Sequence, residues 1–207
     1  MNFSHIIWDW NGTLLDDVDL SLLCVNNILN KRNIPLIDIQ QYRDFVDTPI
    51  IRFYEHLFDF SKITFDVIAD EFYDFYKKNF FMAALSPHAV DILSHFRDSG
   101  CSQIILSSAN TADIKNYINR FGISEYFTDI LGADDFQVGD KIKRAQKYFT
   151  EKGYGNMLLI GDTTHDSDAA AILGAECVLY ANGHQHQAKL ASTGLKVIEN
   201  LADLIDL

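Results

Sequence analysis

The sequence contains few prolines, few cysteines and no long apolar run. Three prolines are present in 207 residues, and none lies in a stretch that would mark a flexible linker. The three cysteines are far apart and form no CxxC pair, which indicates reduced thiols in a cytoplasmic protein. No apolar run reaches the roughly 20 residues that span a bilayer, and the first residues lack the pattern of a secretory signal. We therefore expect a soluble protein without a membrane partner.

Basic residues are also scarce. Lys and Arg number 17 against 29 Asp and Glu, which gives a formal net charge of -12. Proteins that bind the phosphate backbone of DNA or RNA usually carry a basic patch, so no nucleic-acid partner is expected. The same acidity disfavours a phosphorylated small molecule, unless a metal cation and a few local Lys or Arg side chains reverse the field at its site.

Helical patterns dominate the first part of the chain after one short strand. Residues 4–9 (SHIIWD) form an apolar run too short for a helix, which predicts a buried parallel strand. Four successive helices are predicted next, over residues 18–32, from Asp38, from Thr48 to about Leu57, and from Thr64. Asp38 with Gln41 resembles a capping box, and Thr48 with Pro49 resembles an N-cap followed by proline. The absence of strands here predicts a small helical bundle with an aromatic core.

The pattern changes from Ser86 to alternating helices and strands. Ser86 with Pro87 predicts another capped helix start. The helices predicted here are 87–98, 111–120, 140–151 and 166–173, and the strands are 103–106, 129–131, 157–160 and 177–180. This alternation predicts a parallel sheet with helices on both faces. The expected fold is α/β: a doubly wound, Rossmann-like parallel sheet (residues 1–15 and 82–207) with an inserted all-helical cap (residues 16–81).

Polar side chains follow three of the predicted strands. Ligands of open parallel sheets bind beyond the carboxyl ends of the strands, where these side chains would meet. Together with the lysine near the start of helix 140–151, the candidates are Asp9, Asn11, Thr13, Ser107, Ser108, Lys141, Asp162, Asp166 and Asp168. Neighbouring carboxylates repel unless a cation joins them. Hard oxygen ligands without a His or Cys cluster suit Mg²⁺, which would also attract phosphate to an acidic protein.

Four motifs in this arrangement resemble those of the haloacid dehalogenase superfamily. Residues 9–14 (DWNGTL) are similar to its first motif, DxDGTL, and residues 161–166 (GDTTHD) match its fourth, GDxxxD. Ser107 at a strand end is similar to the second motif, and Lys141 matches the third. The second half of the chain looks most like phosphoglycolate phosphatase-like members, and the helical insertion resembles the superfamily's type-one cap. Any one motif is weak, whereas four in order are specific.

The resemblance implies a Mg²⁺-dependent phosphohydrolase acting on a small phosphorylated metabolite, such as a phosphoglycolate-like phosphomonoester. Asp9 would attack phosphorus and form an aspartyl-phosphate, and Lys141 would neutralise the nucleophile and the transferring group. The implied metal ligands are Asp9, the backbone carbonyl of Asn11, Asp162, and Asp166, the last through water or instead as a partner of Lys141. The implied phosphate-binding residues are Ser107, Ser108 and Lys141.

Asn11 departs from the family pattern, because the phosphatases usually carry a second Asp there. That Asp protonates the leaving oxygen and then activates water, whereas Asn holds no transferable proton. Three explanations stay open: a slow natural variant that uses easy leaving groups or another residue such as His165, a catalytically impaired phosphate-binding or regulatory protein, or a different transfer reaction. We favour the first, since Lys141, Asp162 and Asp166 are kept. General acid–base help is worth about 10²–10⁴-fold, so Asn11→Asp is expected to be faster.

The inserted helices should bind the rest of the substrate and exclude water. Arg52, near a predicted helix start, is the candidate for contact with an anionic substrate, against the alternative of a solvated arginine. His184 and His186 are predicted to be surface residues, because no third metal ligand accompanies them. A dehalogenase, which shares the fold without using Mg²⁺, is the rival enzyme class. A monomer or homodimer is expected.

Overall fold

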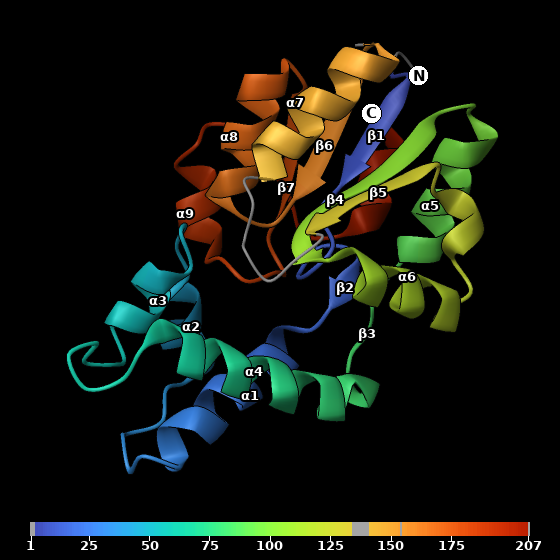
Figure 1. Cartoon of the computed structure of the whole chain (residues 1–207). Coiled ribbons are helices and arrows are strands. Elements are labelled where there is room, and N and C mark those ends of the chain that lie inside the picture. Colours follow the sequence, from blue (N-terminus) through green and yellow to red (C-terminus); the bar gives the residue numbers. More distant parts are fainter. Residues whose placement is uncertain (1–2, 134–140, 154, 207) are drawn as a thin grey trace.

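A computed structural model of the chain describes residues 3–133, 141–153 and 155–206. Its centre is a six-stranded sheet in which every neighbouring pair is parallel, in the order β5-β4-β1-β6-β7-β8 (Figure 1). The strands are β1 (His5–Trp8), β4 (Ser102–Asn110), β5 (Asp129–Ala133), β6 (Met157–Gly161), β7 (Glu176–Tyr180) and β8 (Lys196–Ile198). The chain extends the sheet first on one side of β1 and then on the other, so the switch point lies beside β1.

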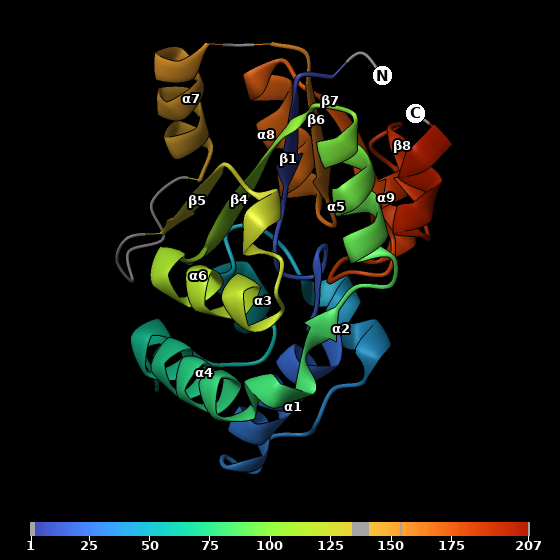
Figure 2. The ribbon, with the colours of Figure 1, turned by 90° about the vertical axis from the view of Figure 1, so that its right-hand side faces the viewer.

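Helices cover both faces of this sheet, as Figures 1 and 2 show. They are α5 (Ala89–Asp98), α6 (Thr111–Arg120), α7 (Lys141–Lys152), α8 (Thr164–Leu173) and the short α9 (Gln187–Ala191). Successive residues of β1 point to opposite faces. Trp8 packs in one cluster with Phe96 of α5, whereas Ile7 packs in another with Phe149 of α7. Burial on both faces explains why β1 is a continuous apolar run.

Between β1 and β4 the chain leaves the sheet and forms a separate group of helices, which we call the cap helices. They are α1 (Val18–Asn30), α2 (Ile39–Phe45), α3 (Ile51–Glu55) and α4 (Phe65–Asn79). They share an apolar core that includes Ile28, Phe53 and Ile68. The chain enters and leaves through a two-stranded antiparallel ribbon, β2 (Leu15–Asp16) and β3 (Ala84–Leu85). In Figure 1 the cap helices lie beyond the carboxyl ends of the strands.

The predicted fold class is confirmed, with a parallel sheet, flanking helices and a helical insertion after the first strand. The capping box of Asp38 and Gln41 is also present. Strand β4 runs further than predicted, through an irregular register between Leu106 and Asn110. β8, α9 and the ribbon were not predicted. Over the described residues, no helix is both long and apolar enough to cross a bilayer.

Two predicted helix starts at proline are wrong. α5 begins at Ala89, and His88 occupies its N-cap position with a left-handed backbone (φ 64°). The N–H of Ser86 donates to the carbonyl of Leu14 at 2.9 Å, so Ser86 prolongs the ribbon. Its carbonyl then accepts the N–H of Ala89 at 3.0 Å in a turn, and the left-handed backbone of His88 prevents the helix from starting at Pro87. α3 likewise begins beyond Thr48. The division between core and cap, predicted after residues 15 and 81, stays a prediction.

Candidate active site

Two carboxylates lie at the ends of neighbouring strands in the middle of the sheet. Asp9 follows β1, and Asp162 follows β6, which pairs with β1 in continuous register. The N–H of Asp9 donates to the carbonyl of Ile160 at 2.8 Å, which extends this pairing by one residue. Both acids are buried, with 9% and 1% exposure. The parallel sheet therefore brings together two acids that are far apart in the sequence.

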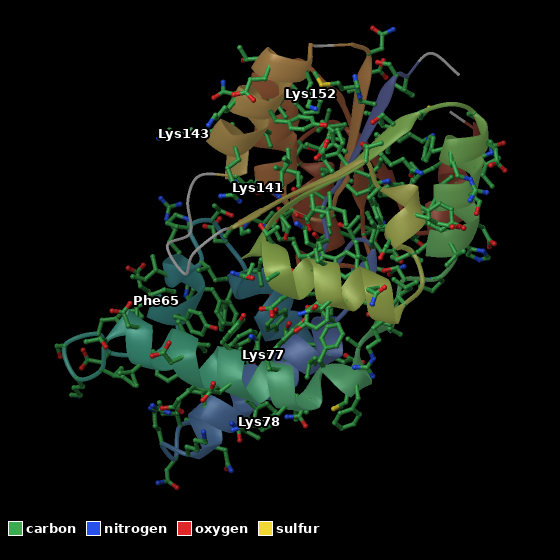
Figure 3. The ribbon with its side chains drawn as sticks, turned by 45° about the vertical axis from the view of Figure 1, so that its right-hand side comes forward. Phe65, Lys77, Lys78, Lys141, Lys143 and Lys152 are labelled. Atoms are coloured by element: carbon green, nitrogen blue, oxygen red, sulfur yellow. The ribbon has the colours of Figure 1, made fainter. Side chains whose placement is uncertain are left out.

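Lys141, labelled in Figure 3, is the first residue of α7. Its side chain reaches the carboxylate of Asp9. Its Nζ donates to Oδ1 of Asp9 at 2.8 Å and to Oδ1 of Asp166 at 2.6 Å. The Lys141 side chain is 5% exposed, so these charged hydrogen bonds form away from water. We call Asp9, Lys141, Asp162 and Asp166 the carboxylate cluster.

Asp166 lies in the first turn of α8 and is held from its other side by Thr163. Its Oδ2 accepts hydrogen bonds from the N–H of Thr163 at 3.0 Å and from the Thr163 hydroxyl at 2.7 Å. The second half of a capping box is thus completed by the same carboxylate that binds Lys141. Asp166 was predicted either to hold the metal through water or to pair with Lys141, and the structure contains the pair with Lys141.

The backbones of two loops close around Asp162. Its Oδ2 accepts the N–H of His184 at 2.6 Å, and its Oδ1 accepts the hydroxyl of Thr13 at 3.3 Å. Gly12 (φ 75°) and Gly183 lie so close that a Cβ added to either would come 2.3 or 2.2 Å from Oδ2. Any larger residue at these positions would displace the carboxylate, so glycine is required at both.

The carboxylate cluster places three acids and one ammonium in a buried space, and this imbalance shifts their pKa values. Burial raises the pKa of Asp9 and of Asp162 well above the usual value, and the attraction of Lys141 for Asp9 does not offset it. Burial also opposes the charged form of Asp166, but Lys141 outweighs it and lowers that pKa. Within the described residues, Asp9, Asp162 and Asp166 can share a metal, since their candidate ligand atoms all lie within 4.8 Å of one another.

The serines predicted to bind phosphate lie in the second half of β4, the strand next to β1. Ser107 is buried, and its Oγ accepts the N–H of Ala109 at 3.1 Å. Its carbonyl accepts the guanidinium of Arg144 at 2.8 Å. Ser108 is exposed. Arg144 was not predicted, although its spacing of three from Lys141 on one helix places both on the same face.

The structure does not bring Arg52 to the carboxylate cluster through any contact among the described residues. Arg52 lies on α3 with its side chain 59% exposed, and it pairs with Asp47 at 3.7 Å. Both partners belong to the cap segment. Contact of Arg52 with a substrate stays a prediction, and its observed surroundings are those of a solvated surface arginine.

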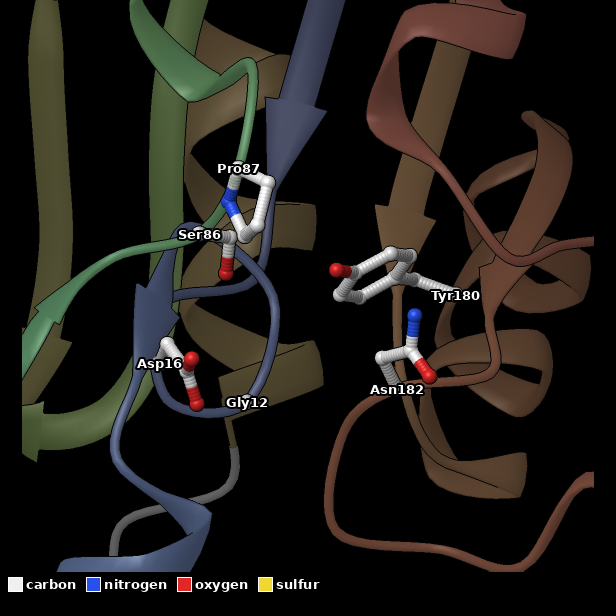
Figure 4. Close-up of a pocket in the computed structure, with 6 residues that line it drawn as sticks. All are labelled: Gly12, Asp16, Ser86, Pro87, Tyr180 and Asn182. Atoms are coloured by element: carbon white, nitrogen blue, oxygen red, sulfur yellow. The ribbon is translucent and has the colours of Figure 1, made fainter.

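A cavity of about 150 Å³ lies beside the loop that follows β1, next to the ribbon (Figure 4). Its lining residues are Gly12, Asp16, Ser86, Pro87, Tyr180 and Asn182. Figure 4 shows Tyr180 and Asn182 facing Asp16 and Ser86 across it. This lining contains no member of the carboxylate cluster, so we place the candidate active site at that cluster instead.

A second buried cluster lies beside the first and was not predicted from the sequence. The Asp17 side chain accepts hydrogen bonds from Asn11, Tyr76 and His184, and we call these four residues the Asp17 cluster. The prediction that His184 is a surface residue is wrong, because its side chain is 13% exposed and bonded on both ring nitrogens. His184 follows the carboxyl end of β7, so the strand-end rule would have found it.

The loop after β7 also connects the cap helices to the core. Nδ1 of His184 lies 2.9 Å from the hydroxyl of Tyr42 on α2. The next residue, Gln185, is fully buried; it accepts the first N–H of α8 at 2.8 Å and donates at 3.1 Å to the carbonyl that follows α2. At the other end, Lys77 of α4 pairs with Asp113 of α6 at 3.2 Å. The cap helices are therefore docked over the carboxyl edge of the sheet.

The fold and the site together define a Rossmann-like α/β enzyme with buried carboxylates and a lysine beneath a helical cap. The chain belongs to the haloacid dehalogenase-like hydrolase family, which it matches over residues 6–180. The phosphoglycolate phosphatase of Vibrio parahaemolyticus is 24% identical to it, over 97% of this chain and 94% of that protein. The enzyme of the same name from Rhodobacter capsulatus is 23% identical, over 87% and 85%. The predicted family is confirmed.

Solved structures share the fold over nearly the whole chain. A haloacid dehalogenase-like family hydrolase from Streptococcus pneumoniae superposes with a TM-score of 0.85 at 19% identity and covers 99% of this chain and 97% of its own. CbbY from Rhodobacter sphaeroides, solved in complex with phosphate, superposes with a TM-score of 0.77 at 18% identity and covers 99% and 100%. At these identities the structures establish the common fold.

Proposed function

We propose that this hydrolase cleaves a small phosphomonoester, with Asp9 as its covalent nucleophile and Mg²⁺ as its cofactor. The family and the relatives named phosphoglycolate phosphatase support a phosphoric monoester hydrolase. The surroundings of Asp9 carry the rest of the proposal. Its carboxylate stands at the carboxyl edge of the sheet, 2.8 Å from Nζ of Lys141 and inside a group of buried acids.

The carboxylate cluster fits a divalent cation. Three acids face one ammonium, so a further positive charge would oppose the effect of burial, which raises the pKa of Asp9 and Asp162. Oxygen donors within 4.8 Å of one another, without His or Cys ligands, suit Mg²⁺ better than Zn²⁺. Asp9, Asp162 and the backbone carbonyl of Asn11 would hold the ion, with Asp166 at its side. Bound there, Mg²⁺ would neutralise charge on the phosphoryl oxygens.

Lys141 prepares Asp9 for attack. Its ammonium favours the ionised carboxylate and, by donating to Oδ1, leaves Oδ2 available to phosphorus. A bond forms between this oxygen and phosphorus while the bond to the leaving oxygen breaks, and water then hydrolyses the aspartyl-phosphate. Phosphoryl transfer depends mainly on in-line positioning of the attacking and leaving oxygens and on neutralisation of charge on the phosphoryl oxygens. Ser107, on the adjacent strand β4, would donate to a phosphoryl oxygen.

Asn11 leaves the leaving oxygen without the usual proton donor. Its amide can hold an oxygen by a hydrogen bond but does not transfer a proton. We therefore expect turnover below that of an enzyme with general acid–base help, which contributes about 10²–10⁴-fold. The loss of rate should be smallest for substrates with weakly basic leaving groups, because these leave without a proton. The relatives, which are named phosphoglycolate phosphatases, favour an enzyme over the alternative of a phosphate-binding protein without activity.

The test measures phosphate release from p-nitrophenyl phosphate and from 2-phosphoglycolate, with Mg²⁺ or with EDTA. The first substrate has a leaving group that needs no proton, so it isolates the attack of the nucleophile. We expect Mg²⁺-dependent release by the wild type and none by Asp9→Asn. The matched control is Asp19→Asn, which removes an exposed acid from α1 and should leave the rate unchanged.

Rapid quenching of the reaction should also trap one phosphoryl group on the peptide that contains Asp9. Release that persists in Asp9→Asn would contradict the assignment of the nucleophile, and release that persists in EDTA would contradict the metal. Phosphate binding without release from either substrate would favour the impaired phosphate-binding protein.

A further inference from the structure

Asp17 occupies a position where its side chain would ordinarily cap a helix. It is the N-cap residue of α1, and an acid there usually accepts the N–H groups of the first turn. Its side chain makes no such bond, although α1 follows directly. The carboxylate is instead turned toward the loop that follows β1, where it is 1% exposed. The hydrogen-bond donors around the carboxylate explain why it is turned away from the first turn of α1.

Four donors from three separate parts of the chain fill both oxygens of Asp17. Oδ1 accepts the N–H of Gly12 at 2.9 Å and faces Nε2 of His184 at 3.2 Å. Oδ2 accepts the amide of Asn11 at 2.8 Å and the hydroxyl of Tyr76 at 2.7 Å. Burial opposes the charged form, but His184 and these hydrogen bonds outweigh it and hold the pKa of Asp17 below its usual value. Asp17 is therefore a charged acceptor whose donors are all in place.

The Asn11 amide is fixed by this arrangement. Its Nδ2 donates both to Oδ2 of Asp17 and, at 3.2 Å, to the hydroxyl of Tyr76. Two acceptors on one nitrogen determine the plane of the amide, so its oxygen is directed away from them. Only a donor suits this position. A carboxylate at residue 11 has no hydrogen for Oδ2 and would set acceptor against acceptor in a buried place.

We propose that Asn11 and Asp17 form a matched amide–acid pair, in which Asp17 is a positioning residue that fixes Asn11 beside the nucleophile Asp9. In this pair residue 17 is the acid that accepts the hydrogen bond, and residue 11 must be an amide that donates it. The kinetic part of this inference rests on the proposed function, whereas the pairing itself does not. From residue 11 alone, the Asn11→Asp enzyme was expected to be faster than the wild type. The pairing with Asp17 predicts instead that it is slower.

The pair is completed by residues of the cap and of the loop after β7. Tyr76 belongs to α4, and His184 in turn contacts Tyr42 of α2. Two of the four groups that hold Asp17 thus depend on docking of the cap helices or on the loop that binds them. Docking of the cap helices therefore completes the set of donors around Asp17, which connects the geometry beside Asp9 to the cap.

The test is a double-mutant cycle of Asn11→Asp, Asp17→Asn and the exchanged double variant N11D/D17N. The exchange restores one donor and one acceptor in reversed order. We expect each single variant to lower both the thermal unfolding midpoint and kcat, and the double variant to recover both, with kcat about tenfold above that of Asn11→Asp. KM should change little, because the pair positions a group and does not bind substrate. As a matched control, Asp19→Asn should combine additively with Asn11→Asp.

Additive losses in the cycle, or an Asn11→Asp enzyme that is as stable and as fast as the wild type, would overturn the pairing. If no variant releases phosphate and neither does the wild type, the proposed function fails, but the unfolding midpoints of the same four proteins still decide the pairing. Should Asn11→Asp be too unstable to purify, Asn11→Ser is compared with Asn11→Ala, since serine keeps a donor and alanine keeps none. A higher midpoint for serine supports the pair, and equal midpoints overturn it.

Discussion

The carboxylate cluster and the Asp17 cluster lie side by side, yet they balance charge in opposite ways. The first collects three acids around one lysine, and burial raises the pKa of two of the acids. The second surrounds one acid with four donors, and its pKa is lowered. One cluster therefore has acceptor capacity to spare, and the other has none.

This difference indicates which cluster is built to take a ligand. An acid-rich cluster gains from an added cation and from a phosphoryl group brought with it. A saturated cluster gains nothing from either, and its contribution is to hold its members in place. Chemistry and positioning are thus assigned to adjacent groups that share the loop after β1.

The largest effect is expected from removing the one cation of the carboxylate cluster. Lys141→Met keeps the length of the side chain and leaves the carboxylates of Asp9 and Asp166 without their partner. Breaking a buried ion pair on one side costs about 3–5 kcal/mol of unfolding free energy. Urea unfolding in EDTA measures this loss. A change below about 1 kcal/mol would show that the acids are relieved by other means, and would remove the contrast between the clusters.

Addition of Mg²⁺ should stabilise one cluster only. At a concentration a hundred times its dissociation constant, a ligand specific for the folded state adds about 2.7 kcal/mol. We expect a rise of this order in the wild type, its loss in Asp162→Asn, and its retention in Asp17→Asn. Thermal unfolding with increasing Mg²⁺ measures it without any substrate. Equal losses in both variants would mean that the Asp17 cluster also contributes to metal binding.

A smaller effect is expected when one donor of the saturated cluster is removed. Tyr76→Phe deletes a hydroxyl that donates to Asp17 at 2.7 Å, while three donors remain. The expected cost is about 1 kcal/mol in urea unfolding. Tyr126→Phe, which removes a hydroxyl bonded to Ser94 at 2.9 Å, serves as a control outside both clusters. A cost equal to that of Lys141→Met would contradict the redundancy of the donors.

The smallest effect is expected from an ion pair near the surface of the cap helices. Hydrogen bonds from Arg32 lower the pKa of Glu71, so the pair stabilises the fold above the ordinary Glu pKa of 4.5 and loses this effect as the pH falls through the lowered value. Glu71→Gln should cost about 0.5 kcal/mol at neutral pH and nothing in strong acid. Thermal unfolding at both pH values measures the difference, with the exposed Asp70→Asn on the same helix as control. A loss that persists in acid would contradict the charge argument.

The sequence predicted the members of one cluster and missed the key members of the other for a physical reason. Asp9, Asp162 and Asp166 follow strands whose parallel pairing can be read from apolar runs, so their meeting point was predictable. Lys141 was a candidate from its place near the start of the predicted helix 140–151, and the family resemblance supplied its role. Asp17 meets Tyr76 and His184 only through the way the cap helices dock, and no periodicity encodes that docking.

Helix starts predicted from short capping motifs were less reliable next to the ribbon of β2 and β3. Asp38 and Gln41 form their predicted capping box because both partners lie within one turn. Ser86 does not cap the helix after it, because it prolongs the ribbon through a bond to Leu14 and the left-handed backbone of His88 separates it from the first helical turn. Motifs completed within a few residues could be predicted, whereas those in competition with a distant strand could not.

The ribbon at the base of the cap brings the two crossings of the chain together. Leu15 pairs with Leu85 and Asp16 with Ala84, so the two points where the chain crosses between core and cap are adjacent. A change in the length of the inserted segment therefore leaves the order of the strands in the sheet unchanged. Leu20, Cys24 and Tyr76 of the cap helices nevertheless pack in one apolar cluster with Trp10 of the core. Removal of the whole segment would expose this surface to water and would take Asp17 and Tyr76 away from residue 11.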